Sequence, residues 1–237
     1  MIKAVLFDLD GTLYRQSRLR LMMAGELATV PWFQHAPWRV SRVWRMLQTF
    51  RHVREELRVL GRPAEPLERL QYTLAAERAG VAVGEMETVV REWIFTRPLK
   101  YLRQVVRPHT DEVLGGLRDR GLRLGVFSDY PAVDKLKAMG LEQRFGMTLE
   151  ATETDVNAFK PHPRGFLVAA DRWGLSPADV LYVGDRAEVD AVGAAAAGMP
   201  AVVIGSDAPA PADGRFVIVP GMRELFDRVT SVAGGQS

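Results

Sequence analysis

The stretch K-A-V-L-F-D-L-D-G-T-L, residues Lys3–Leu13, carries the strongest functional signal in the chain. Its apolar run at 4–7 predicts a short, fully buried strand. Because successive side chains of a strand point to opposite faces, Asp8 and Asp10 leave this strand on the same side. Gly11 then permits a sharp turn, since it has no Cβ. Two like charges on one side are costly, which predicts that a cation or a proton is shared there.

The composition is typical of a soluble globular protein, with 47% hydrophobic and 25% charged residues among 237. A chain of this length builds one domain or two small ones. It has no cysteine, which excludes disulfides, zinc–thiolate sites and thiol nucleophiles. No signal peptide is expected, because the apolar run after Lys3 is only a few residues long and reaches Asp8 at once. No membrane span is expected either, because the longest weakly polar stretch, 191–205, contains Pro200 and falls short of the ~20 residues that a span needs. We therefore expect a cytoplasmic protein.

Charge divides the chain into two parts. Residues 13–107 hold 17 Lys and Arg against 9 Asp and Glu, a net charge of +8, whereas the remainder carries −6. This asymmetry indicates two modules with different surfaces. The interval between Asp8 and Ser128 supports the division, because a strand–helix–strand unit needs only about 30 residues. We interpret residues 15–107 as an insertion.

The insertion has the pattern of a helical subdomain. Apolar residues recur at three- and four-residue spacing over 40–60, which is typical of an amphipathic helix. Gly61 and Pro63 predict its end. Shorter helical patterns follow at 67–79 and 85–95.

Strands and helices alternate along the rest of the chain. Strands are expected at 122–127, 180–183, 201–204 and 216–219, and helices at 110–120, 131–139, 166–173, 190–197 and 222–232. Thr110 is placed to cap the first of these helices. The alternation predicts an α/β fold, a Rossmann-like parallel sheet with helices on both faces. In such open sheets, ligands bind at the carboxyl ends of the strands.

Residues that carry chemistry follow the expected strands or lie in the loops between them. They are Asp8 and Asp10, Ser128, Lys160, and Asp185 with Asp190. Each is ordinary by itself, because a serine after a strand is often a turn residue, a loop lysine is often solvated, and an aspartate often caps a helix. Their joint occurrence in this order is far more specific. It predicts that all of them meet at one end of one sheet.

At these residues the chain resembles the haloacid dehalogenase (HAD) superfamily. Its D-L-D-G-T-L is similar to the first motif of that family, and Ser128 stands where the second lies. Lys160-Pro161 is similar to the third motif and Gly184–Asp190 to the fourth. The resemblance implies a phosphatase-type hydrolase with a Rossmann-like core and a helical cap inserted after the first motif. The implied boundaries are 1–14 and 108–237 for the core and 15–107 for the cap.

The resemblance also implies a mechanism. Asp8 is the nucleophile, which attacks phosphorus to form an aspartyl phosphate. Asp10 protonates the leaving alcohol and then activates the water that hydrolyses this intermediate. Mg²⁺ is the implied cofactor, with Asp8, Asp185 and the backbone carbonyl of Asp10 as ligands, in keeping with its preference for oxygen.

Further positions bind the phosphoryl group or support the residues that do. Neutralising charge on the equatorial oxygens is the main task of a phosphoryl-transfer site. The resemblance assigns this task to Ser128 and Lys160, together with backbone N–H groups near Asp10 and Asp129. The supporting positions are Asp190, which holds Lys160 or a metal-bound water, Gly11 and Thr12.

Other reactions on this scaffold are distinguished by single residues. Dehalogenases of the family lack the second acid of the first motif, so Asp10 disfavours dehalogenation. Phosphonate-cleaving members need a cap lysine to form a Schiff base, and the single lysine of residues 13–107 is Lys100, near the expected hinge. A sugar-phosphate mutase remains an alternative, because such enzymes keep Asp10. A binding protein for nucleic acid or another anionic partner, with a phosphatase-like core, is an alternative that the intact acids disfavour.

Substrate and partners are only coarsely defined by the sequence. We expect a small phosphorylated substrate and neither a membrane nor nucleic acid as partner, and the sequence does not define the oligomeric state. Phosphoglycolate-phosphatase-like members often carry an acid where this chain has Tyr14 and Arg15. The candidates for substrate recognition are Arg15, Arg18 and Arg20 after the first motif. The aromatic residues expected to form a small cap core or to line the pocket are Trp32, Phe33, Trp38 and Trp44.

Overall fold

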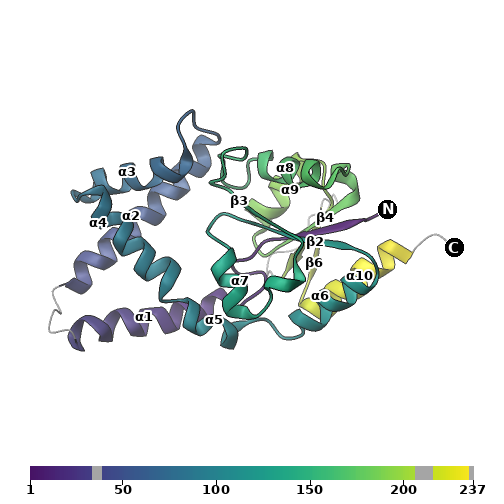
Figure 1. Cartoon of the computed structure of the whole chain (residues 1–237), viewed down its shortest axis with the longest axis horizontal. Helices are drawn as coiled ribbons and strands as arrows, with labels where there is room; N and C mark the ends of the chain where they lie inside the picture. Colours follow the sequence, from purple (N-terminus) through teal and green to yellow (C-terminus); the bar gives the residue numbers. More distant parts are fainter. Residues whose placement is uncertain (34–38, 206–215, 235–237) are drawn as a thin grey trace.

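The computed structural model describes residues 1–33, 39–205 and 216–234. Within these ranges, six strands form one parallel sheet in the order β3-β2-β1-β4-β5-β6 (Figure 1). The strands are β1 Ala4–Phe7, β2 Arg123–Ser128, β3 Met147–Glu150, β4 Val180–Gly184, β5 Ala201–Ile204 and β6 Phe216–Val219. The predicted α/β fold with a parallel sheet is confirmed.

The first strand lies in the middle of the sheet and is buried on both faces. Ala4 and Leu6 pack into one apolar cluster, and Val5 and Phe7 pack into another on the opposite face. All four side chains are fully buried. A strand that is covered on both sides carries a continuous apolar run rather than an alternating one, which explains why this stretch is so clear in the sequence.

Helices cover both faces of the sheet (Figure 1). On the face of Leu6 lie α8 (Arg164–Trp173) and α9 (Val192–Ala196). On the face of Phe7 lie α6 (Thr110–Asp119), α7 (Val133–Met139) and α10 (Met222–Gly234). Short helical turns occur at Glu142–Arg144, Pro177–Asp179 and Ala187–Ala191.

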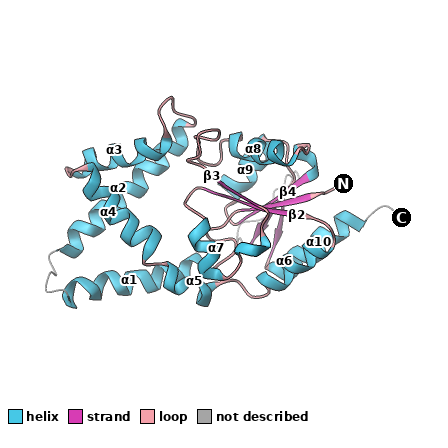
Figure 2. Ribbon diagram, in the orientation of Figure 1, coloured by secondary structure: helices cyan, strands magenta, loops and turns pink. Residues whose placement is uncertain are grey.

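The helices between β1 and α6 form the inserted segment, of which α1 to α4 stand beside the sheet (Figure 2). They are α1 Gln16–Phe33, α2 Arg39–Leu60, α3 Leu67–Ala79, α4 Val83–Val90, a π-helical turn Arg91–Thr96, and α5 Leu99–Val105. Leu57 of α2 belongs to the same apolar cluster as Phe127 of β2, and Leu102 of α5 to the same cluster as Phe7. The boundaries between core and cap therefore stay a prediction, because apolar packing continues across them.

Some local predictions are wrong for identifiable reasons. Thr110 does not cap α6, because its hydroxyl donates to the carbonyl of Arg107 at 2.8 Å and His109, at a φ of 64°, takes the capping position. β3 lies outside the predicted strands, since its sequence M-T-L-E has no apolar run. α1 lies outside the predicted helices, since its apolar residues follow no clear helical period. None of the helices in the described ranges combines the length and apolar character that a membrane span requires.

Candidate active site

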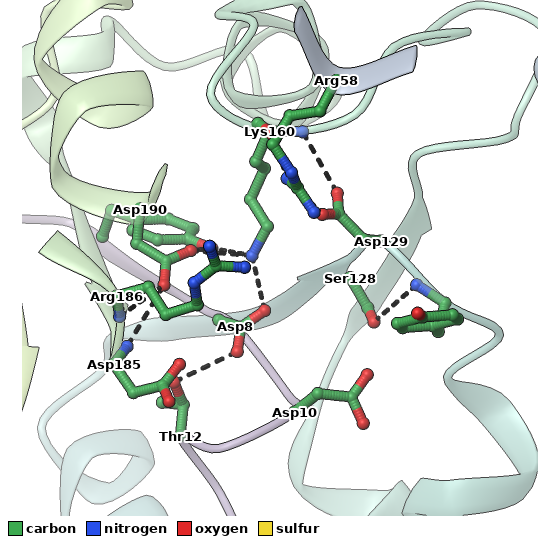
Figure 3. A network of polar contacts seen from close by, with 12 residues as sticks. Asp8, Asp10, Thr12, Arg58, Ser128, Asp129, Lys160, Asp185, Arg186 and Asp190 are labelled. Carbon is green, nitrogen blue, oxygen red and sulfur yellow. Dashed lines mark hydrogen bonds and ion pairs between the residues drawn. The ribbon is translucent and has the colours of Figure 1, made fainter. Parts of the chain in front are cut away.

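The carboxyl ends of the three central strands bring predicted site residues together (Figure 3). β1 pairs in parallel with β4, so Asp8 and Asp185 follow neighbouring strand ends. β2 flanks β1 on the other side and ends at Ser128. Lys160 reaches the same place from the loop that precedes α8 (Figure 3).

Asp8 lies at the centre of this group and is 5% exposed. One carboxylate oxygen accepts a hydrogen bond from Lys160 Nζ, and the other accepts one from Thr12 Oγ1 at 3.2 Å. Burial raises the pKa of Asp8 well above its usual value, and the negative charges of Asp190 and Asp185 add to this rise. Lys160 acts in the opposite direction. The nucleophile candidate is thus fixed in a place that requires positive charge.

Lys160 is the buried cation of the site. Its Nζ donates to Asp190 Oδ1 at 2.8 Å and to Tyr182 OH at 2.9 Å, in addition to its bond with Asp8. Burial alone would lower the pKa of Lys160, but the carboxylates of Asp190 and Asp8 raise it well above its usual value. The ammonium group therefore stays charged beside Asp8.

Asp190 is hydrogen-bonded through both of its carboxylate oxygens. Oδ1 accepts from Lys160 Nζ and from Tyr182 OH at 3.0 Å. Oδ2 accepts from the backbone N–H groups of Asp185 and Arg186 at 3.2 and 3.0 Å. Asp190 therefore connects the lysine to the turn that follows β4.

The carboxylates of Asp8, Asp185 and Asp190 form a cluster in which oxygens lie within 4.8 Å of one another. Burial, followed by the charge of Asp190, raises the pKa of Asp185 to about 6. Among the described residues, no donor forms a hydrogen bond with the Asp185 carboxylate. Gly11, at a φ of 104°, makes room for it, because a Cβ there would lie 2.1 Å from Asp185 Oδ2. The cluster thus offers oxygen ligands that suit a divalent cation.

The carboxylate of Asp10 lies outside this cluster and has its own contacts. Lys135 Nζ of α7 donates to its two oxygens at 2.5 and 2.8 Å, and the hydroxyl of Tyr14 donates to Oδ1. Burial and the charge of Asp10 raise the pKa of Tyr14 well above its usual value, so the phenol stays protonated. Asp10 nevertheless lines the same cavity as Asp8. Its backbone carbonyl as a metal ligand stays a prediction.

Ser128 and Asp129 follow β2 and contact different partners. Ser128 is fully buried, and its Oγ accepts a hydrogen bond from the N–H of Tyr130 at 3.1 Å. Asp129 accepts from the N–H of Lys160 at 3.1 Å and from Arg58 Nη1 at 2.9 Å. Burial alone would raise the pKa of Asp129, but the charges of Lys160 and Arg58 lower it. Asp129 therefore joins two core loops to helix α2.

A cavity of about 980 Å³ adjoins these groups and is walled on the other side by α1 and α2. Asp8, Asp129, Lys160 and Asp185 all line it. Of the three arginines predicted for substrate recognition, Arg20 lines the cavity, whereas Arg15 and Arg18 do not. A role of these three arginines in substrate recognition stays a prediction.

The predicted aromatic core of the cap is not formed by Trp44. This side chain is 48% exposed and lines the cavity, which agrees with the alternative of a pocket residue. Trp38 lies outside the described residues, and so do the side chains of Trp32 and Phe33. A small buried cluster in the cap instead contains Leu27, Leu47 and Trp93.

The structure adds two arginines of α2 to the predicted site. Arg58 donates to Asp129 and also to the carbonyl of Lys160. Arg54 donates to the carbonyl of Asp129 at 2.7 Å. Its guanidinium lies 3.9 Å from the ring centre of Tyr130 and 4.0 Å from that of Phe159. No sequence signal predicts these contacts, since the hydrogen-bonded partners lie more than seventy positions away.

Residues 2–198 match the sequence profile of the haloacid dehalogenase-like hydrolases. The chain belongs to this family. A phosphoglycolate phosphatase of Escherichia coli O157:H7 is 30% identical over 223 residues, which cover 85% of this chain and 80% of that protein. A glyceraldehyde 3-phosphate phosphatase of Methanopyrus kandleri is 31% identical over 216 residues, covering 86% of this chain and 84% of the relative.

Solved structures agree with this HAD-like assignment. A HAD phosphatase from Thermococcus onnurineus is 25% identical, with a TM-score of 0.64 over 99% of both chains. A 2-haloacid dehalogenase from Pseudomonas syringae shares the fold, with a TM-score of 0.67 and 24% identity over 98% of this chain and all of the other. The predicted family and enzyme class, a HAD-like hydrolase of the phosphatase type, are confirmed.

Proposed function

We propose that this HAD-like hydrolase is a Mg²⁺-dependent phosphomonoesterase that acts on small phosphorylated metabolites through an aspartyl-phosphate intermediate. One observation carries the proposal: Asp8 lines the cavity beside Lys160 and shares a cluster of carboxylate oxygens with Asp185. This arrangement combines a nucleophile, a cation for the phosphoryl oxygens and ligands for a divalent ion. The relatives, which are named as phosphatases, support the same reaction class.

In the proposed first step, an oxygen of Asp8 attacks phosphorus and the ester oxygen leaves. Lys160 neutralises charge on a phosphoryl oxygen, and Ser128 with the backbone N–H groups near Asp10 and Asp129 supplies further donors. Asp190 and Tyr182 orient Lys160 for this role, because both accept hydrogen bonds from its ammonium group.

Asp10 is the proposed acid and base. It gives a proton to the leaving oxygen in the first step and takes one from water in the second, when that water attacks phosphorus and restores the Asp8 carboxylate. The contacts with Lys135 and Tyr14 fix Asp10 in the resting site, so its carboxylate needs to exchange or shift a hydrogen bond to reach the ester oxygen. Thr12 steadies Asp8 from the turn between the two acids.

The residues present fit Mg²⁺. Asp8 and Asp185 offer carboxylate oxygens, whereas both oxygens of Asp190 already accept hydrogen bonds. We therefore assign the ion to Asp8, Asp185 and the backbone carbonyl of Asp10. When bound, Mg²⁺ would offset the negative charge gathered by the carboxylates and the phosphoryl group.

The test compares the wild type with Asp8→Asn and with Asp227→Asn, an exposed control on α10. Release of phosphate is measured for glycolate 2-phosphate, glyceraldehyde 3-phosphate and an aryl phosphate, each with Mg²⁺ and with a chelator. The wild type and the control are expected to hydrolyse at least one ester, only with metal, and to trap a radiolabelled phosphoryl group on acid quench. Asp8→Asn is expected to stay folded, by circular dichroism, and to lose both signals. Turnover by folded Asp8→Asn would remove Asp8 from the role of nucleophile.

A further inference from the structure

The cavity beside Asp8 changes in character along helix α2. Five residues of this helix line it at three- and four-residue spacing, which places them on one face: Arg58, Glu55, Arg51, Leu47 and Trp44. Arg58 contacts Asp129 and Lys160 and thus marks the end where the phosphoryl group would lie. At a rise of about 1.5 Å per residue, Trp44 lies roughly 20 Å further along the helix. The wall is therefore charged near the reaction site and apolar far from it.

Helix α1 repeats this order on the facing wall. Its polar lining residues, Gln16, Ser17 and Arg20, all lie in the part of the helix just after the first motif, where Leu19 and Leu21 line the cavity as well. Further along the helix, the lining residues include Met23, Ala24 and Leu27, all of them apolar. In both helices, the polar lining residues therefore lie near the reaction site, and the far part contributes apolar side chains only.

The far end of the cavity is one apolar surface. Leu27, Leu47 and Trp93 are buried against one another, and Met23 and Ile94 pack on them while remaining partly accessible. All five line the cavity. Continuous apolar surface on the wall of a binding cavity is typical of contact with an apolar part of a ligand.

Trp44 extends this surface at the cavity wall. Its side chain is 48% exposed although it is one of the largest apolar groups available. Covering such a ring with an apolar ligand would remove a large area from water.

The volume of the cavity also indicates a ligand larger than a small polar ester. At about 980 Å³, it reaches the upper end of the range for small-molecule sites, about 300–1,000 Å³. An ester with a two- or three-carbon polar alcohol, bound at Asp8 and Lys160, would not reach Trp44 and would leave its ring in contact with water.

We infer that the preferred substrate is a phosphate monoester of an elongated alcohol that ends in an apolar alkyl or aryl group. The inference rests on the proposed phosphomonoesterase function. The phosphoryl group lies at Asp8, the polar part of the alcohol passes Arg20 and Arg51, and the apolar end contacts Leu47 and Trp44. In the reaction the P–O bond to the alcohol breaks, Asp10 supplies the proton, and the alcohol leaves with its apolar group unchanged.

The experiment measures kcat/KM of the Mg²⁺-loaded enzyme for ethyl, butyl and octyl phosphate, with phenylpropyl phosphate as an aryl arm and glycolate 2-phosphate as a small polar reference. Each methylene that leaves water on binding is expected to raise kcat/KM by about fourfold until the chain fills the apolar end. A gain in the alkyl series alone, or in the aryl arm as well, defines which apolar group the site prefers.

Trp44→Ala tests the location of the apolar end. The ratio of kcat/KM for octyl phosphate to that for ethyl phosphate is expected to fall about tenfold in this variant. Val59→Ala is the matched control, because Val59 is on the same helix, is 88% exposed and does not line the cavity, and it should keep the wild-type ratio.

The outcomes separate this inference from the function on which it rests. Hydrolysis of glycolate 2-phosphate or ethyl phosphate with no gain along the series overturns the inference and leaves the proposed function intact. A gain that Trp44→Ala does not reduce overturns the placement of the apolar group in this cavity. Absence of hydrolysis for every ester, with folded enzyme and Mg²⁺, contradicts both proposals.

Discussion

Lys135 Nζ lies 2.5 and 2.8 Å from the two carboxylate oxygens of Asp10, and the Lys135 residue is only 6% exposed. The lysine comes from α7 and therefore ties a core helix to the turn of the first motif. Tyr14 donates to the same carboxylate from the turn itself. Asp10 is thus held by two donors, neither of which belongs to the cluster around Asp8.

Replacement of Lys135 by Met should weaken catalysis through Asp10. The variant keeps the stem of the side chain but leaves the carboxylate without its cation, so its orientation is less fixed. We expect kcat to fall about tenfold to hundredfold for an alkyl phosphate. The loss should be smaller for nitrophenyl phosphate, whose leaving group needs no proton. Lys137→Met on the exposed side of α7 is the control, and an equal loss for both esters would contradict the positioning of a general acid.

Arg54 should stabilise the folded protein through its contacts between α2 and the core. It is 3% exposed, stacks between Tyr130 and Phe159, and donates to the carbonyl of Asp129. Arg54→Lys keeps the charge but loses the planar group, so the free energy of unfolding is expected to fall by about 2 kcal/mol. Urea unfolding measures the change. Arg45→Lys at an exposed position of α2 should have no effect, and an Arg54→Lys curve that overlaps the wild type would show that the stacking contributes little.

The strand-end positions of the site could be predicted because local sequence determines them. Asp8, Ser128 and Asp185 each follow or end a strand that is almost wholly buried, and parallel pairing brings such ends to one edge. The contacts of Asp10 could not be predicted, since Lys135 lies 125 residues further along the chain. The catalytic roles of Asp8, Asp10 and Asp185 stay predictions.

In the cap, sequence patterns predict the helices but not their contacts with the core. The amphipathic period of α2 predicts that a helix forms, but it does not indicate which core loop its polar face meets. Arg54 and Arg58 therefore look like any other arginines of this basic segment until the fold places them beside Asp129. The charge excess of the cap likewise does not reveal that Arg20 faces the cavity while Arg18 does not.

Glu26 should make stability depend on pH. It accepts hydrogen bonds from Arg97 at 2.6 Å, Lys100 at 2.9 Å and Tyr101 at 3.0 Å. Burial alone would raise the pKa of Glu26, but these donors lower it below its usual value. A lowered pKa in the folded state means that the stabilisation is present above the unfolded pKa and is lost as the pH falls through the folded one.

Glu26→Gln is therefore expected to lower the free energy of unfolding by about 2 kcal/mol at neutral pH. The difference from the wild type should stay constant down to about pH 5 and shrink as the pH falls below about 4. Denaturant unfolding at several pH values measures it, with the exposed Glu77→Gln as control. A difference that is the same at every pH would assign the effect to packing rather than to the charge of Glu26.

Gly11→Ala should weaken Mg²⁺ binding and catalysis by displacing the carboxylate of Asp185. The new Cβ would lie 2.1 Å from Asp185 Oδ2, so the carboxylate has to leave its place in the acidic cluster. We expect the Mg²⁺ concentration for half-maximal activity to rise and kcat to fall, each by about tenfold or more. Gly80→Ala is the matched control, because Gly80 also has a positive φ, of 65°, but nothing lies within 4 Å of its Cβ position. The control should lose about 1 kcal/mol of stability with the Mg²⁺ dependence unchanged. Wild-type Mg²⁺ dependence in both variants, with equal losses of stability, would mean that Gly11→Ala introduces backbone strain alone. It would also contradict the assignment of Asp185 as a Mg²⁺ ligand.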